Sequence, residues 1–84
     1  MSSFHTAVKT NVSRTQRYDA IDELIRAGDT RNLAVLVQLD GLRGEFRRYA
    51  LDGLAECHAT ARLESLAADR SIDRPLRRKA ERLI

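Results

Sequence analysis

The fold of this chain follows from one stretch, which reads Phe46-Arg47-Arg48-Tyr49-Ala50-Leu51-Asp52-Gly53-Leu54. It places an apolar residue first, then Arg, then Ala three residues after the Arg, then a branched aliphatic residue. Residues 76–84 return to this register thirty positions later, and residues 16–24 carry its Arg, Ala and aliphatic residue thirty positions earlier. A period of this length is typical of chains that stack copies of one supersecondary unit.

Residues that lie thirty positions apart form a column of the repeat. One column holds Arg17, Arg47 and Arg77, and another holds Ala20, Ala50 and Ala80. Five further columns agree between the first two units, namely Asp22 with Asp52, Leu24 with Leu54, Thr30 with Thr60, Leu33 with Leu63, and Leu36 with Leu66. We interpret each unit as a helical hairpin whose apolar stripe is covered by its neighbours. The repeat therefore predicts an all-α fold, a short α-solenoid of about five antiparallel helices.

Apolar spacing and capping signals divide residues 13–84 into the helices of this repeat domain. We expect helices at about 14–27, 30–39, 45–57, 59–68 and 73–84. Ser13 and Gln16 match the capping-box pattern at the first of them, and Gly28 can end that helix in the left-handed conformation. Asp73 can cap the last helix. Gly53 costs about 1 kcal/mol relative to Ala inside a helix, which indicates a neighbour that packs closely there.

The first twelve residues are polar, and two structures remain open for them. Phe4, Ala7 and Val8 have the spacing of a helix face, which favours a short helix. An N-terminal arm laid over the first full helix is the other interpretation, because chain ends are often loosely held.

The composition favours one small soluble domain. The chain has 84 residues, of which 43% are hydrophobic and 32% charged. Its longest apolar run, residues 33–37, is far shorter than the ~20 residues that a membrane helix requires. The N-terminus lacks the basic start and apolar block of a secretory signal, and the single Cys57 excludes an intrachain disulfide. These features predict a cytoplasmic protein that does not enter a membrane.

Positive charge gathers at the end of the sequence. The whole chain has a net charge of +3, and residues 70–84 alone carry +4. A basic last helix can bind a phosphate backbone, so nucleic-acid binding is one alternative function. The other interpretation is a solvated helix face. Nucleic-acid grooves more often interleave aromatic residues with charge of one sign, whereas here Asp22 and Asp52 share the column of Arg82.

No residue pattern points to catalysis, a cofactor or a metal. Cys57 and His58 are neighbours in sequence, and side chains at such positions on a helix do not face each other. A thiol–imidazole nucleophile and a zinc site both require groups that converge, and His5 is the only other histidine. Carboxylates at Asp22, Glu23, Asp52 and Glu56 are interpreted as solvating. We therefore expect no enzyme activity, no cofactor and no metal site.

The repeat resembles HEAT-like repeats of the short type found in phycobilisome lyases. The residues that carry this resemblance are Arg17, Ala20, Leu24, Gly28, Asp29, Leu33 and Leu36, then Phe46, Arg47, Ala50 and Leu54, then Leu76, Arg77 and Ala80. The resemblance implies a helical stack in which a turn aspartate braces the recurrent arginine. By that rule Asp40 would pair with Arg47, and Asp69 with Arg77. His58 and Ala59 depart from the Gly-Asp step of the first unit.

A stack of this kind is expected to be a non-catalytic protein–protein interaction or scaffold module. Its partner-binding surface would be a solvent-facing row on the helices that start each unit, made of Tyr18, Asp22, Arg48, Asp52, Arg78 and Arg82. An intrahelical pair between Arg48 and Asp52 is the alternative role for those two residues. The last helix ends with Leu83 and Ile84 and lacks a polar cap, so self-association through this end is a further hypothesis.

Overall fold

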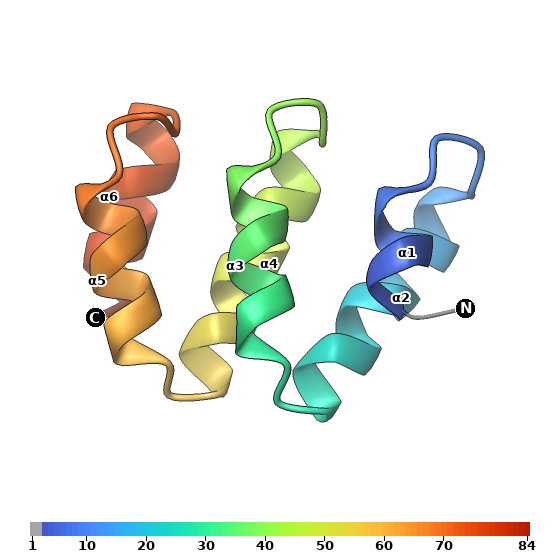
Figure 1. Ribbon diagram of the computed structural model, residues 1–84, viewed down its shortest axis with the longest axis horizontal. Helices are drawn as coiled ribbons and strands as arrows, with labels where there is room; N and C mark the ends of the chain where they lie inside the picture. Colours follow the sequence, from blue (N-terminus) through green and yellow to red (C-terminus); the bar gives the residue numbers. More distant parts are fainter. Residues whose placement is uncertain (1–2) are drawn as a thin grey trace.

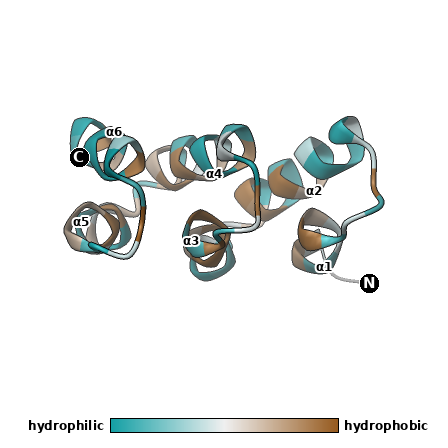
Figure 2. Ribbon diagram, turned by 90° about the horizontal axis from the view of Figure 1, so that it is seen from above, coloured by the Kyte–Doolittle hydropathy of each residue, from teal (hydrophilic) through white to brown (hydrophobic). Residues whose placement is uncertain are grey.

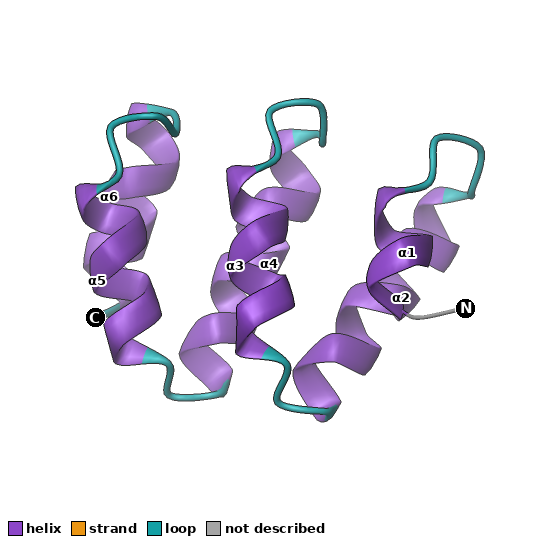
Figure 3. Ribbon diagram, in the orientation of Figure 1, coloured by secondary structure: helices purple, strands orange, loops and turns teal. Residues whose placement is uncertain are grey.

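Residues 3–84 are described by the computed structural model, and they contain six α-helices and no strand (Figures 1 and 3). The helices are α1 (Ser3–Val8), α2 (Arg14–Arg26), α3 (Thr30–Gln38), α4 (Gly44–Glu56), α5 (Thr60–Ala68) and α6 (Arg74–Leu83). The all-α prediction is confirmed. The sixth helix is α1, in the segment for which an arm or a short helix was expected; the first two residues of that segment lie outside the described part.

The helices form two layers. Seen from above, α2, α4 and α6 make one layer, and α1, α3 and α5 make the other (Figure 2). Consecutive pairs α1–α2, α3–α4 and α5–α6 lie side by side along the longest axis (Figure 1). The starts of α2, α4 and α6 at Arg14, Gly44 and Arg74 are thirty residues apart, as are the starts of α3 and α5. The repeat in the sequence is thus a repeat of helix boundaries.

The same turn follows α2 and α4. Gly28 has φ of 66°, and His58, its column partner, has φ of 56°. After Gly28 the amide of Asp29 donates to the Leu24 carbonyl at 2.9 Å, and after His58 the amide of Ala59 donates to the Leu54 carbonyl at 3.0 Å. These bonds close the helix ends in the same way. A left-handed backbone is ordinary for Gly but strained for His.

Side-chain caps form at the starts of α2 and α3 and are absent at the starts of α5 and α6. Ser13 and Gln16 form the predicted capping box, with hydrogen bonds of 3.1 and 2.9 Å. Asp29 accepts from the amide of Asn32 at the start of α3. Ala59, the column partner of Asp29, makes no side-chain cap at α5. Asp73 stands at the N-cap of α6 but its carboxylate makes no capping bond, so that prediction was wrong.

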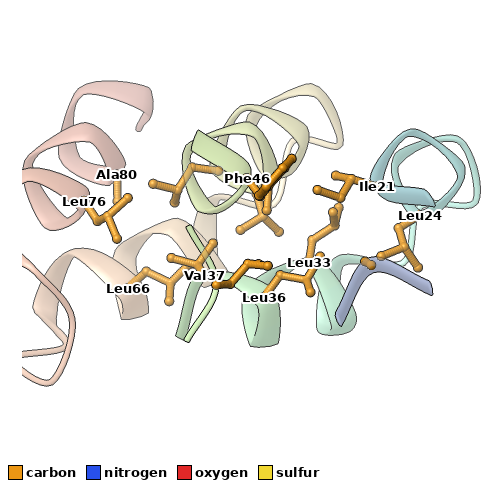
Figure 4. Close-up of a cluster of buried hydrophobic side chains, with 14 of the residues drawn as sticks. Ile21, Leu24, Leu33, Leu36, Val37, Phe46, Leu66, Leu76 and Ala80 are labelled. Atoms are coloured by element: carbon orange, nitrogen blue, oxygen red, sulfur yellow. The ribbon is translucent and has the colours of Figure 1, made fainter. Parts of the chain in front are cut away.

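The apolar core lies between the two layers (Figure 4). Its fully buried large side chains are Ile21, Leu33, Leu36, Leu51, Leu54, Leu63 and Val37. The three alanines of the Ala column are at most 4% exposed, which lets neighbouring helices approach closely. Small side chains at helix crossings and branched aliphatic ones between layers are what the repeat predicted.

Arg47 is the one charged side chain buried in this core, at 4% exposed, among the described residues. Its Nε donates to the Val37 carbonyl at 2.8 Å, and its Nη2 lies 3.8 Å from Asp40, as the HEAT-like resemblance implied. Nη1 lies 3.9 Å from Asp73, whose carboxylate makes no capping bond at α6. Arg17 makes a similar link by donating to the carbonyl of Lys9, just after α1. Arg17 and Arg47 therefore tie α2 and α4 to the ends of α1 and α3, whereas the buried Nε of Arg77 has no hydrogen-bond partner within the described residues.

Asp69 does not pair with Arg77, so the second implied pair was wrong. Its carboxylate accepts from the hydroxyl and amide of Ser71, at 2.6 and 2.9 Å, and from Gln38 at 3.2 Å. The Ser71 hydroxyl contributes most to lowering the pKa of Asp69. The register gives the reason, because Arg70, and not Asp69, occupies the column of Asp40.

Replacing His58 by Gly and Ala59 by Asp restores the Gly-Asp step of the first unit. We expect the double variant to raise the free energy of unfolding by about 2 kcal/mol, since relief of the left-handed strain and a new helix cap each contribute about 1 kcal/mol. Urea unfolding followed by circular dichroism measures this. Gly28→Ala is the matched control and should lower the free energy of unfolding by a similar step; an unchanged midpoint for both would refute the assignment of the turn.

Gly53 lies against Ile25, as its place in a helix interior predicted. A Cβ at Gly53 would come 2.5 Å from Cγ1 and 2.7 Å from Cδ1 of Ile25. Gly53→Ala should therefore lower the free energy of unfolding by about 1–3 kcal/mol, although Ala is the better helix former. Gly44→Ala is the control, because there a Cβ meets only the mobile end of the Arg48 side chain. It should leave stability unchanged or raise it, and a loss at both positions would contradict the packing argument.

Candidate protein interface

The first two residues of the predicted row lie at the junction of α2 with α4. The ring of Tyr18 is 5.0 Å from Phe46 and 4.9 Å, edge to face, from Tyr49. The hydroxyl of Tyr49 donates to Asp22 at 2.5 Å. Both Tyr18 and Asp22 are half-buried, so they join two helices and are not the freely solvent-facing residues that the sequence predicted.

The hydrogen bond to Asp22 sets the chemistry of Tyr49. That bond, followed by burial and the charge of Asp22, raises the pKa of Tyr49 to about 12. The phenol therefore keeps its proton, and remains a donor, to a higher pH than an ordinary tyrosine. It holds the ring in place over Tyr18 and keeps the α2–α4 junction closed.

Arg48 and Asp52 lie at the equivalent junction of α4 with α6. Asp52 pairs with Lys79 of α6 at 3.1 Å, and its side chain remains 51% exposed. Within residues 3–84 Arg48 forms no ion pair, and its guanidinium lies back over Gly44. The intrahelical pair between Arg48 and Asp52 was therefore wrong, because the neighbouring helix supplies a closer cation. Both residues are exposed.

The last two residues of the row lie on the free side of α6. Arg78 and Arg82 are exposed, and Arg74 precedes them by one helical turn. Together with Pro75 these arginines line a shallow hollow. Three guanidinium groups on successive turns, none in an ion pair within the described chain, make this the most basic surface of the helix.

A groove between α3 and α5 was not foreseen from the sequence. Its floor is formed by Ala34, Val35, Ala61 and Leu66, and Arg31 and Arg62 stand among its walls. Arg62 donates through Nε to the Thr30 hydroxyl at 3.0 Å, which bridges the two helices. The small residues Ala34 and Ala61 are the signal in the sequence that could have indicated it.

The residues considered for catalysis or metal binding do not converge. The half-buried Cys57 thiol contacts the Ile25 carbonyl at 3.5 Å, and His58 is exposed. Across residues 3–84 no group of three or more His, Cys, Asp or Glu side chains is placed to hold a metal ion. In the same range no helix has the length and apolar content to cross a membrane.

Comparison of the chain with models of known protein families, with curated proteins and with solved structures finds no match.

The raised pKa of Tyr49 predicts a loss of stability at high pH. The folded chain holds the phenol proton more tightly than the unfolded chain, so the stabilisation is complete below pH 10 and is lost as pH rises toward 12. Tyr49→Phe should cost about 1–2 kcal/mol at pH 8 and should flatten the pH dependence between those values. Urea unfolding at each pH checks this, and an equal alkaline loss in both proteins would count against the hydrogen bond.

Proposed function

We propose that this chain is a small, non-catalytic HEAT-like repeat protein, an α-solenoid that acts as a protein–protein interaction or scaffold module. The proposal rests on the layer of α2, α4 and α6. In this layer the 30-residue repeat determines which side chains meet between neighbouring helices and which side chains are exposed. At the α2–α4 junction Tyr49 contacts Asp22, and at the α4–α6 junction Lys79 contacts Asp52. The two contacts join the same two columns of the repeat. A stack built this way presents side chains at regular intervals on a rigid surface, which is how repeat proteins bind extended partners.

The binding surface in this proposal is the predicted row, centred on α4. Arg48 and Asp52 lie side by side there, exposed and of opposite charge. Tyr18 and Asp22 border them from α2, and Arg78 and Arg82 border them from α6. Mixed charge along the row favours a protein partner with its own alternating charges, because complementary pairs set register and orientation more than affinity.

Nucleic-acid binding is the second candidate, favoured only by the row Arg74, Arg78 and Arg82 on α6. Three arginines on one helix could neutralise few phosphates. The tyrosine rings lie away from this row at the α2–α4 junction, in contact with each other and with Phe46, so they do not offer stacking platforms beside it.

The row is tested by exchanging its central charges. Arg48→Glu with Asp52→Lys keeps the net charge, and Arg31→Glu with Glu64→Lys makes the matched exchange on the opposite layer. We expect a protein retained by the immobilised wild-type chain, from nuclease-treated lysate, to be retained by the control and lost by the row variant. Equal retention by all three chains would refute the row as the binding surface.

Labelled DNA and RNA added to the wild-type chain at low salt decide the second candidate. Binding that weakens steeply as salt rises, and that Arg78→Glu with Arg82→Glu abolishes, would replace the protein-binding proposal. Absence of any change in fluorescence anisotropy would remove nucleic acid from consideration.

A further inference from the structure

We propose that copies of this chain associate head to tail, with the free side of α6 in one copy against the free side of α2 in the next. The inference rests on the proposed function, since it names a second copy of the chain as one protein partner. The two surfaces involved are called here the tail face, made of Arg74, Arg78, Glu81 and Arg82, and the head face, made of Ser3, Thr6, Gln16, Asp19 and Glu23.

The register of the repeat says which residues meet across a junction. Asp22 contacts Tyr49, and Asp52 contacts Lys79, so the same spacing of 27 residues recurs. The column of Asp22, Asp52 and Arg82 therefore meets the column of Asp19, Tyr49 and Lys79. Within the described chain nothing packs on Arg82 or Asp19 from its free side, and both are exposed. If the stack continued into a second copy, Arg82 would meet Asp19 of that copy.

Neighbouring residues extend the same match. Tyr18 packs on Tyr49, so the column that ends at Arg78 also meets the column of Asp19. Glu23 lies one turn beyond Asp19 on α2 and is exposed. The tail face thus offers two arginines where the head face offers carboxylates. This complementarity runs in one direction only, because a tail-to-tail contact would place arginine against arginine.

Columns that hold buried apolar residues inside the stack hold polar residues at the head face and the tail face. Ser3, Thr6 and Gln16 occupy columns that hold Leu33, Leu36 and Phe46 in the next unit, and these three apolar residues are buried. Glu81 occupies the column of Ile21 and Leu51, which are both 0% exposed. The structure therefore corrects the expectation that the last helix lacks a polar cap. In the continued register Glu81 would meet the Thr6 hydroxyl and the side-chain amide of Gln16, which can donate hydrogen bonds to its carboxylate, whereas the Ser3 hydroxyl already donates to Glu23.

One apolar residue is left over on the tail side. Ile84 is 57% exposed, whereas Leu24 and Leu54 in its column are at most 4% exposed. A second copy in the continued register would also cover Ile84. A polar interface with one apolar residue is weak, so association should be dynamic and sensitive to salt.

Charge reversal of each face gives a sharp test with the intact chain. Arg78→Glu with Arg82→Glu makes the tail face acidic, and Asp19→Lys with Glu23→Lys makes the head face basic. Arg31→Glu with Arg62→Glu, on the α3–α5 groove, is the control with the same change of charge as the tail variant. Sedimentation equilibrium at low salt, from micromolar to millimolar chain, gives the average mass, and circular dichroism checks that each variant is folded.

We expect the average mass of the wild type and the control to rise at least twofold with concentration, and to fall back at high salt. Each face variant alone should associate at least about 100-fold more weakly, because like charges then meet. An equimolar mixture of the two face variants should associate again, since every acidic face then finds a basic one. Association of the wild type, its loss in each face variant alone and its recovery in the mixture are together the result that a head-to-tail contact predicts.

Three results would overturn the proposal. They are a wild-type chain that stays monomeric at millimolar concentration, a head-face variant that associates like the wild type, and a mixture that fails to associate. If a double variant does not fold, Arg82→Glu and Asp19→Lys are measured in the same way as single exchanges. The row is tested apart from the two faces by Arg48→Glu with Asp52→Lys, which changes neither face. The tail variant also changes Arg78 and Arg82 of the row, whereas the head variant changes no residue of the row, so association that the head variant loses is assigned to the head-to-tail contact alone.

Discussion

No helix pair of this protein can bury its own apolar stripe, and the rest of the structure depends on that constraint. Ile21 and Leu51 hold one column and are completely buried, because a following pair of helices lies over each of them. Glu81 holds the same column in α6, over which no further pair lies within residues 3–84. Burial of a large aliphatic side chain is worth roughly 1.5–3 kcal/mol, so each added pair stabilises the pair before it. Stability in such a stack resides in the junctions as much as in the single hairpins.

Close approach at the junctions explains why small residues recur. The helices of one layer must come near enough for Tyr18 to touch Tyr49 and for Ile25 to lie on Gly53. Arg47 has a different role, because its side chain donates to one of the carbonyls at the end of α3 that have no partner within the helix. A charged Nε–H donor to the Val37 carbonyl is a direct bond, whereas Asp40 and Asp73 are largely in water and contribute little to stability. Arg17 and Arg47 thus secure the ends of α1 and α3, because each is a long side chain whose guanidinium donates to a carbonyl there.

Local chemistry was readable from the sequence, and contacts between units were not. The capping box at Ser13 and the left-handed Gly28 depend on neighbours in the chain, so sequence patterns identify them. The segment of α1 was ambiguous because its core columns hold Ser3 and Thr6, which hide the helical stripe. The partner of Asp52 was missed because Lys79 reaches it from another helix. The repeat register pairs these two residues only once a contact across another junction, such as that of Tyr49 with Asp22, is known.

In a repeated unit, packing against the neighbouring units restricts the residue types at buried positions but not those at exposed positions. Interior columns are fixed by packing, so Leu, Ile and Ala return there. At the two ends of the stack the same columns carry Ser, Thr, Gln and Glu, which keep each end soluble while offering groups that can hydrogen-bond. The free sides of α2 and α6 also differ in sign of charge, although the junction between α2 and α4 shows no such polarity and is aromatic. Charge of opposite sign therefore lies where packing does not require it, and exposed charges of this kind set register and orientation when two surfaces meet.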